Sequence, residues 1–193
     1  MRNAYKAKFF MALSLALMIR TAVAFGFEMT PAVQTELDKM KTVIAVWAAD
    51  PVIVKGVMEQ NGKGPIPAMD NAKWKTTRRS DAVVTEFQAH PAGKFLKAKL
   101  DASNGEFTEA FLSAAQGEKV AFVEKTTSYI HKGQPKFDVP LGSGKSWQGS
   151  AEFDESAQTY QIQISVPVKN EGKTIGALVV GVNLTHLEKI VKN

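Results

Sequence analysis

The chain contains no cysteine. It therefore forms no disulfide bond, offers no thiolate metal ligand and lacks the Cys-x-x-Cys-His sequence that attaches c-type haem. Its histidines, His90, His131 and His186, are isolated in the sequence and do not have the spacing of a metal site. We expect neither a metal nor a cofactor, and a surface or structural role for each histidine.

Long apolar runs are also scarce, and the most prominent lies at the amino terminus, from Phe9 to Ile19. A basic segment precedes it and Ala22-Val23-Ala24 follows it, which is the pattern of a secretory signal peptide. The run is shorter than the roughly 20 residues that cross a bilayer. We expect cleavage after Ala24 and a periplasmic protein. Arg20, a charge in an unusual place, leaves an uncleaved membrane anchor as the alternative.

The excess of basic residues belongs to this leader. Residues 1–24 contain four of the 24 Lys and Arg and none of the 19 Asp and Glu, which leaves residues 25–193 with a net charge of +1. A charge so close to zero argues against nucleic acid as a partner. Residues 25–193 suffice for one domain with its own core.

Signatures of catalysis are missing as well. Gly-x-Ser-x-Gly is absent, and the segment Leu141 to Ser146 ends like a phosphate-binding loop but has Val139 where that loop requires glycine. Its glycines predict a flexible turn instead. Asp154 and Glu155 are adjacent, so their side chains point in different directions and do not form a catalytic pair. We expect no enzyme activity.

Two helices are expected first after the leader. Thr30-Pro31 is a helix start, and apolar residues recur at helical spacing from Val33 to Trp47. Asp50-Pro51 predicts a kink or restart, because the residue before proline is pushed away from helical angles. A second helix is expected over residues 52–60. The glycines and proline of residues 61–65 predict its end.

The carboxy-terminal part predicts a hairpin of two strands. Gln161 to Val166 alternates polar and apolar side chains, which is typical of a strand with one buried face. Lys169 to Lys173 predicts the hairpin loop, with Gly172 at positive φ. Thr174 to Val182 is apolar at almost every position, which predicts a strand covered on both faces. A short closing helix is expected from Leu184.

These segments resemble the Cache family, the extracytoplasmic PAS-like ligand-sensing domains of bacteria. The resemblance rests on the hairpin with its closing helix, residues 153–187, and on Glu109 to Phe137, where two strands are expected on either side of Gln116-Gly117-Glu118. Residues of the second block that match single Cache proteins are Lys125, Thr126, Tyr129, Lys136 and Phe137. Ser128 replaces an expected Asp, and Gly133-Gln134 replaces an expected acidic pair.

The resemblance implies an α/β (α+β) fold. In this fold a central antiparallel sheet carries long amino-terminal helices on one face and a small ligand pocket on the other. Receptors of this kind continue through a membrane helix into signalling modules, and no second apolar segment of that length follows the leader. We therefore expect a single sensing domain, residues 25–193, with no transmitter attached.

The resemblance also implies where a ligand would bind. The loop of residues 125–129 borders the pocket in that fold, and a lysine ammonium beside hydroxyl groups suits a carboxylate. The candidate ligand-binding residues are Trp74, Arg78, Lys125, Thr126, Ser128, Tyr129, Trp147 and Gln163. The alternatives are a solvated connector for the loop, packing roles for the two tryptophans, a solvated pair for Arg78 with Arg79, and a wet strand face for Gln163.

A periplasmic protein that binds a small organic anion or amino acid is the function that the resemblance implies. Such a protein acts through a partner that distinguishes its bound and free states, and a membrane receptor or transporter is expected. A homodimer is left open. The alternative is a structural or protein-interaction module that keeps the fold without a ligand, which the replaced residues Ser128, Gly133 and Gln134 favour.

Overall fold

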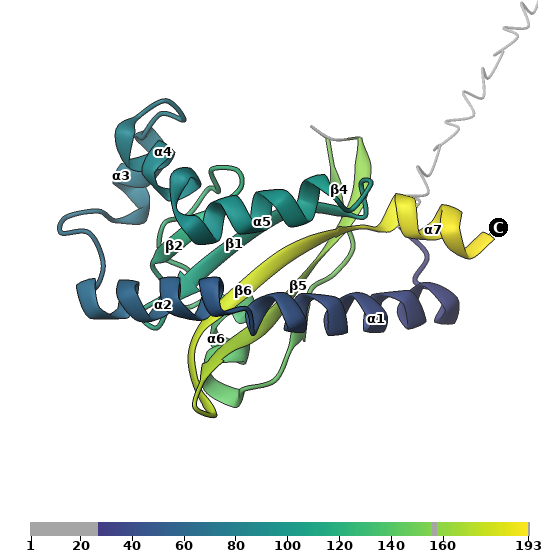
Figure 1. Cartoon of the computed structure of the whole chain (residues 1–193). Helices are drawn as coiled ribbons and strands as arrows, with labels where there is room; N and C mark the ends of the chain where they lie inside the picture. The colour runs from purple at the N-terminus through teal and green to yellow at the C-terminus, as the bar shows by residue number, and fades with distance from the viewer. Residues whose placement is uncertain (1–26, 156–157, 193) are drawn as a thin grey trace, which may run out of the picture.

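The structure, a computed structural model, describes residues 27–155 and 158–192. The expected signal peptide lies outside these residues. A six-stranded antiparallel sheet has the order β2-β1-β6-β5-β3, and β4 also pairs with β5 (Figure 1). The strands are β1 (Phe107–Ala114), β2 (Lys119–Phe122), β3 (Trp147–Gln148), β4 (Glu152–Asp154), β5 (Thr159–Asn170) and β6 (Lys173–Asn183).

Helices precede, interrupt and follow the strands. They are α1 (Pro31–Ala48), α2 (Pro51–Lys63), α3 (Asn71–Thr76), α4 (Ala82–Ala89), α5 (Pro91–Asp101), α6 (Pro135–Ser143) and α7 (Leu184–Lys192). Within the described residues, no helix combines the length and hydrophobicity that a membrane span requires. The expected α/β fold with a central antiparallel sheet is confirmed.

Both amino-terminal helices begin where the sequence predicts. The Thr30 hydroxyl accepts the Val33 N–H at 3.3 Å, and the Asp50 carboxylate accepts the Val52 N–H at 2.9 Å. The predicted end of α2 is wrong, because the helix continues through residues 61–63 and ends at Gly64, whose φ is +73°. The side chain of Asn61 explains the extension, since it bonds Ile175 O at 2.9 Å and Ala115 N at 2.8 Å and so fixes the last turn to the sheet.

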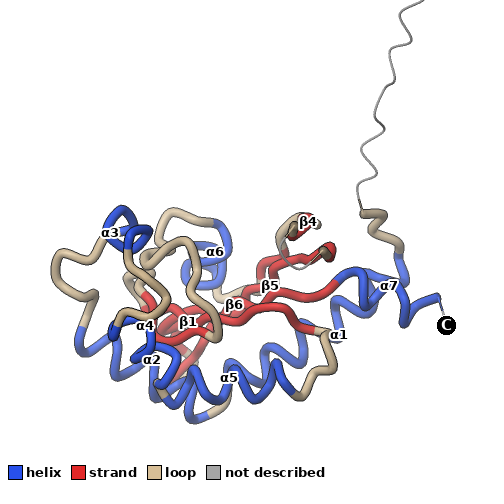
Figure 2. Tube along the Cα trace, turned by 90° about the horizontal axis from the view of Figure 1, so that it is seen from above, coloured by secondary structure: helices blue, strands red, loops and turns tan. Residues whose placement is uncertain are grey.

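Helices α1, α2 and α5 cover one face of the sheet (Figure 2). Alternate side chains of the strands meet them, because successive residues of a strand point to opposite faces. This interface is the main core, and its members include Leu37, Ile44, Ile53, Leu96, Leu112 and Val180. The opposite face carries a second core of Trp74, Val84, Phe111, Phe122, Tyr129 and Val179 beneath α3 and α4, while α6 packs on β5 and β6.

The carboxy-terminal hairpin is longer than its sequence pattern predicts. Its turn consists of Glu171 and Gly172 only, with φ of +49° and +79°, as a two-residue turn of the primed type requires. The strands therefore include Lys169 and Lys173, which were expected in the loop. The prediction of two covered faces for the second strand is confirmed, since residues 176–182 are all buried.

Helix α6 replaces the flexible turn expected around Leu141 to Ser146. The helix runs from Pro135, a favourable first residue, to Ser143 and ends at Gly144, which has φ of +64° and ψ of +14°. Gly144 thus terminates the helix in the left-handed conformation. The turn prediction is wrong for residues 141–143, because packing of Phe137 and Pro140 into the core stabilises a helix that local propensity disfavours.

Candidate ligand-binding cavity

A cavity of about 570 Å³ lies on the sheet face opposite α1. Its lining residues are Arg79, Thr108, Glu109, Phe111, Glu124, Lys125, Thr126, Thr127, His131, Lys136, Asp154, Gln161 and Gln163. They come from β1, β4, β5, α6, the connection between α3 and α4, and the chain between β2 and α6, so segments far apart in sequence converge here. The volume lies within the roughly 300–1,000 Å³ that small-molecule sites occupy.

The floor of the cavity is a chain of hydrogen bonds across the sheet. Lys136 Nζ donates to Gln163 Oε1 at 2.9 Å, and Gln163 Nε2 donates to Glu109 Oε1 at 2.6 Å. Beside it, Thr108 Oγ1 donates to Gln161 Oε1 at 2.7 Å. These bonds fix the orientation of side chains that would otherwise sample many rotamers, which preorganises the floor.

Gly181 of β6 lies opposite Glu109 and Gln163 in the sheet. A Cβ atom at this position would collide with the side chains of Thr108 and Glu109. The absence of a side chain therefore gives the polar residues of β1 and β5 room to meet across β6.

The inner end of the cavity is built around the ring of Phe111. The His131 ring lies 4.7 Å from the Phe111 ring, centroid to centroid, and Lys136 Nζ lies 5.8 Å from the Phe111 centroid. Lys119 Nζ lies behind the lining, 3.2 Å from the same centroid, and its side chain is fully buried. Basic side chains thus outnumber Glu109, the carboxylate of this end.

Burial has the largest effect on the pKa values of His131 and Lys119. It lowers the pKa of His131 to about 2, with further lowering by the charges of Lys119 and Lys136. Burial also lowers the pKa of Lys119 well below its ordinary value, while Glu109 favours the proton and Lys136 opposes it. His131 is therefore a neutral imidazole at the inner end of the cavity.

The outer rim carries both signs of charge. Arg79 Nη1 and Glu124 Oε2 form an exposed ion pair at 3.5 Å, an arrangement that contributes little stability. Lys125 Nζ lies 4.7 Å from the centroid of the Trp74 ring. Partial burial, and then the charge of Arg79, lower the pKa of Lys125. The rim thus presents two cations that face a solvent-accessible opening.

Some proteins of known structure share this architecture. No family model matches the chain. The solved sensor domain of the Vibrio cholerae histidine kinase DctB matches it with a TM-score of 0.52 at 13% identity, over 84% of this chain and 54% of that one. The Escherichia coli DcuS sensor domain matches with a TM-score of 0.47 at 13% identity, over 83% of this chain and 98% of that one. The chain has the fold of a Cache sensor domain.

A curated relative is also similar in sequence. It is the membrane fusion protein SilB of Salmonella typhimurium, 24% identical over 131 residues, which is 63% of this chain and 30% of SilB. This chain therefore spans less than two thirds of SilB and of the DctB sensor domain.

Within the Cache fold, some of the predicted site residues line the cavity. Lys125, Thr126 and Gln163 do so. Trp147 lines an adjoining hollow of about 170 Å³, which shares Gln161 and Gln163 with the main cavity. Residues predicted from two separate segments, the loop at 125–129 and the strand face at 161–165, therefore line the same cavity.

The remaining predicted residues lie elsewhere. Trp74 is fully buried in the second core and donates its Nε1–H to Thr126 O at 2.8 Å. Tyr129 is also fully buried, and its hydroxyl accepts the Ile66 N–H at 2.9 Å. The backbone carbonyl of Ser128 accepts a hydrogen bond from the Thr126 hydroxyl at 2.8 Å. Arg78 is exposed, and it is its neighbour Arg79 that lines the cavity. These residues support the cavity wall or lie outside it.

Sequence reasoning missed several residues of the inner end. His131 was expected to have a surface or structural role, and Lys119, Glu109 and Lys136 were not named as site residues. A signal existed for Lys119, because a lysine that opens the apolar strand Lys119–Phe122 is a charge in a segment otherwise suited to burial.

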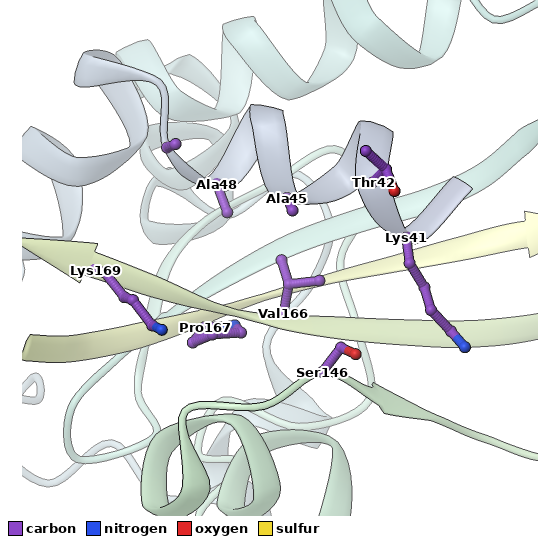
Figure 3. Close-up of a pocket in the computed structure, with 9 residues that line it drawn as sticks. Lys41, Thr42, Ala45, Ala48, Ser146, Val166, Pro167 and Lys169 are labelled. Carbon is purple, nitrogen blue, oxygen red and sulfur yellow. The ribbon is translucent and has the colours of Figure 1, made fainter. Parts of the chain in front are cut away.

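A second hollow, of about 430 Å³, lies between α1 and the edge of β5 (Figure 3). Ala45 and Ala48 of α1 face Val166 and Pro167 of β5, and Lys41 and Lys169 stand at opposite ends. Its floor is formed by small apolar side chains. The cavity on the opposite face, with its convergent polar groups, is therefore the better candidate site.

Proposed function

We propose that this chain is a periplasmic small-molecule-binding protein of the sensor type, which takes a small organic anion or amino acid into the cavity opposite α1. The observation that carries the proposal is the set of cations around one preorganised floor. Lys125 and Arg79 stand at the rim and Lys136 at the inner end. Ammonium and guanidinium groups bind carboxylates through charge-assisted hydrogen bonds, and Glu109 and Asp154 offer acceptors for the amine of an amino acid.

Signalling then takes place through a partner. A bound ligand changes a partner's response only if the partner binds the two states of the domain differently. The partner we propose is a membrane-bound receptor or transporter. The fold shared with a histidine kinase sensor domain and the similarity to a membrane fusion protein both support a membrane-associated partner.

A protein-interaction module is the second candidate, because one specific surface favours it. Val46 and Val43 are 67% and 39% exposed and belong to α1, the helix whose Thr42 and Ala45 line the second hollow. Neighbouring exposed apolar side chains, rather than isolated ones, are typical of a surface that a partner covers.

A thermal-shift screen of the purified protein against amino acids, organic acids, amines and purines tests the proposal. A ligand at a hundredfold excess over its Kd stabilises the protein by about 2.7 kcal/mol, which raises Tm by roughly 5–11 °C. We expect a shift that Lys136→Met abolishes and that Lys97→Met, a matched change at an exposed position of α5, retains. A screen without any shift contradicts ligand binding and favours the interaction module.

A further inference from the structure

Lys119 is a buried lysine whose Nζ lies against the Phe111 ring. Its side chain is 0% exposed, and Nζ has no hydrogen-bond partner. Ser113, opposite Lys119 in the sheet, and His131 each have a buried polar atom, Oγ and Nδ1, that is likewise unpaired. An ammonium group buried without an acceptor is strongly destabilised, so such a lysine either loses its proton or gains an anion.

The groups that face Lys119 come from every element packed on its side of the sheet. Strand β1 contributes Phe111 and Glu109, the segment after β2 contributes His131, and α6 contributes Lys136. The neighbouring Glu118, which precedes β2, accepts the Gln116 N–H at 3.1 Å. Among the described residues no carboxylate forms an ion pair with Lys119.

We propose that the inner end of the cavity, beside Lys119, His131 and Lys136, is an anion subsite, and that Lys119 takes up a proton when an anion enters it. This inference rests on the proposed anion binding and specifies which groups at the inner end of the cavity would respond to the anion. With the cavity empty, Lys136 opposes a second positive charge and the proton leaves Lys119. A carboxylate or sulfate group placed there supplies the missing negative charge, and the protonated form becomes the stable one.

Proton uptake makes affinity depend on pH. Where Lys119 is neutral in the empty protein and charged in the complex, one proton binds with each anion, and Kd rises about tenfold per pH unit. His131 does not share this titration, since its pKa of about 2 keeps it neutral near pH 7. Acetate, succinate and sulfate are suitable probes above pH 7, because their own charges are constant there.

The test is an NMR titration of the purified protein with ¹³Cε-labelled lysine, in which Lys119→Met assigns the Lys119 signal. In the empty protein, Lys119 is expected to be neutral at pH 7, whereas the exposed Lys97 is charged. Saturating succinate or sulfate is expected to raise the Lys119 midpoint by at least one pH unit. Kd for the probe is expected to rise about tenfold per pH unit, a dependence that Lys119→Met removes and Lys97→Met keeps.

The outcomes separate this inference from the proposed function. A Lys119 that is charged in the empty protein at pH 7 overturns the inference, whatever binds. Probes that shift the Lys136 signal but leave the Lys119 midpoint unchanged overturn it too, while anion binding stands. If none of the probes shifts any lysine of the cavity, anion binding is contradicted and the inference falls with it. If Lys119→Met does not fold, the wild-type spectrum still tests the inference, because a spectrum in which no lysine is neutral at pH 7 overturns it.

Discussion

The Nζ atom of Lys119 lies 3.2 Å from the centre of the Phe111 ring and has no hydrogen-bond partner. An ammonium group in this place has the ring face as its nearest attractive partner, which contributes about 2 kcal/mol when desolvated. The effective penalty for burying such an ion is several kcal/mol. The native state is therefore more stable when Lys119 is neutral, in keeping with the lowered pKa that burial produces.

Lys119→Met is expected to stabilise the protein at pH 7 by roughly 1 kcal/mol or more, because methionine fills a similar volume without a charge to desolvate. The lowered pKa fixes the sign of the pH dependence. Below the ordinary lysine pKa the unfolded wild type binds the proton that the folded state rejects, so wild-type stability rises with pH. The advantage of the variant should shrink as pH approaches 10.5.

Urea unfolding of both proteins between pH 7 and 10 measures this difference. Lys97→Met is the matched control, since Lys97 is exposed on α5 and pairs with Asp101 at 2.8 Å. An advantage of Lys119→Met that does not change over this pH range would show that Lys119 keeps its proton on folding.

His131→Phe is expected to make the protein more tolerant of acid. The pKa of His131 is lowered from 6.5 to about 2, so stability attributable to this residue is fully present above pH 6.5 and lost as pH falls. The loss amounts to about 1.4 kcal/mol per pH unit for one proton. Phenylalanine keeps a ring against Phe111 and removes the titration. Unfolding free energies at pH 6.5 and 5 should therefore diverge between wild type and variant, and parallel losses would contradict this account.

Substitutions of Tyr129 in the loop at 125–129 and of Lys136 in α6 are expected to have opposite phenotypes. Tyr129→Phe leaves the partly buried Ile66 N–H without its acceptor, which should cost about 1 kcal/mol of stability. Lys136→Met should change stability less and abolish the ligand-induced shift, because Lys136 lines the cavity. Thermal unfolding with and without ligand measures both effects. A Tyr129→Phe variant that folds normally but no longer binds ligand would show that Tyr129 belongs to the binding site.

The sequence predicted those parts of the fold that depend on local patterns. The alternation in β5, the continuous apolar run of β6 and the helix starts at Thr30 and Asp50 each follow from a periodicity or a cap, and each is confirmed. Element ends and α6 depend on contacts from distant segments. Neither the Asn61 bonds to Ile175 and Ala115 nor the packing of Phe137 can be deduced from neighbouring residues.

The candidate site was predicted at its rim and at Gln163 of its floor, but not at its inner end, for the same reason. Lys125 and Thr126 were accessible to sequence reasoning because they leave a strand for a loop. Burial of Lys119 arises when residues after β2 fold back over it, through the bridge between Glu118 and Ile130 and the bond from His131 N to Gly117 O at 2.8 Å. The burial of Lys119 therefore results from tertiary contacts, which no local sequence pattern encodes.

The extension of α2 beyond its expected end predicts that two glycines of the same segment respond oppositely to alanine. Gly62 is helical and has no heavy atom within 4 Å of an added Cβ, whereas Gly64 has a φ of +73°. Gly62→Ala should therefore stabilise the protein by about 0.4–1 kcal/mol, through reduced entropy of the unfolded chain. Gly64→Ala should destabilise it by about 1 kcal/mol or more, because alanine is strained at that φ. Urea unfolding of the two variants beside wild type measures both signs, and a destabilised Gly62→Ala would mean that α2 ends before residue 62 in solution.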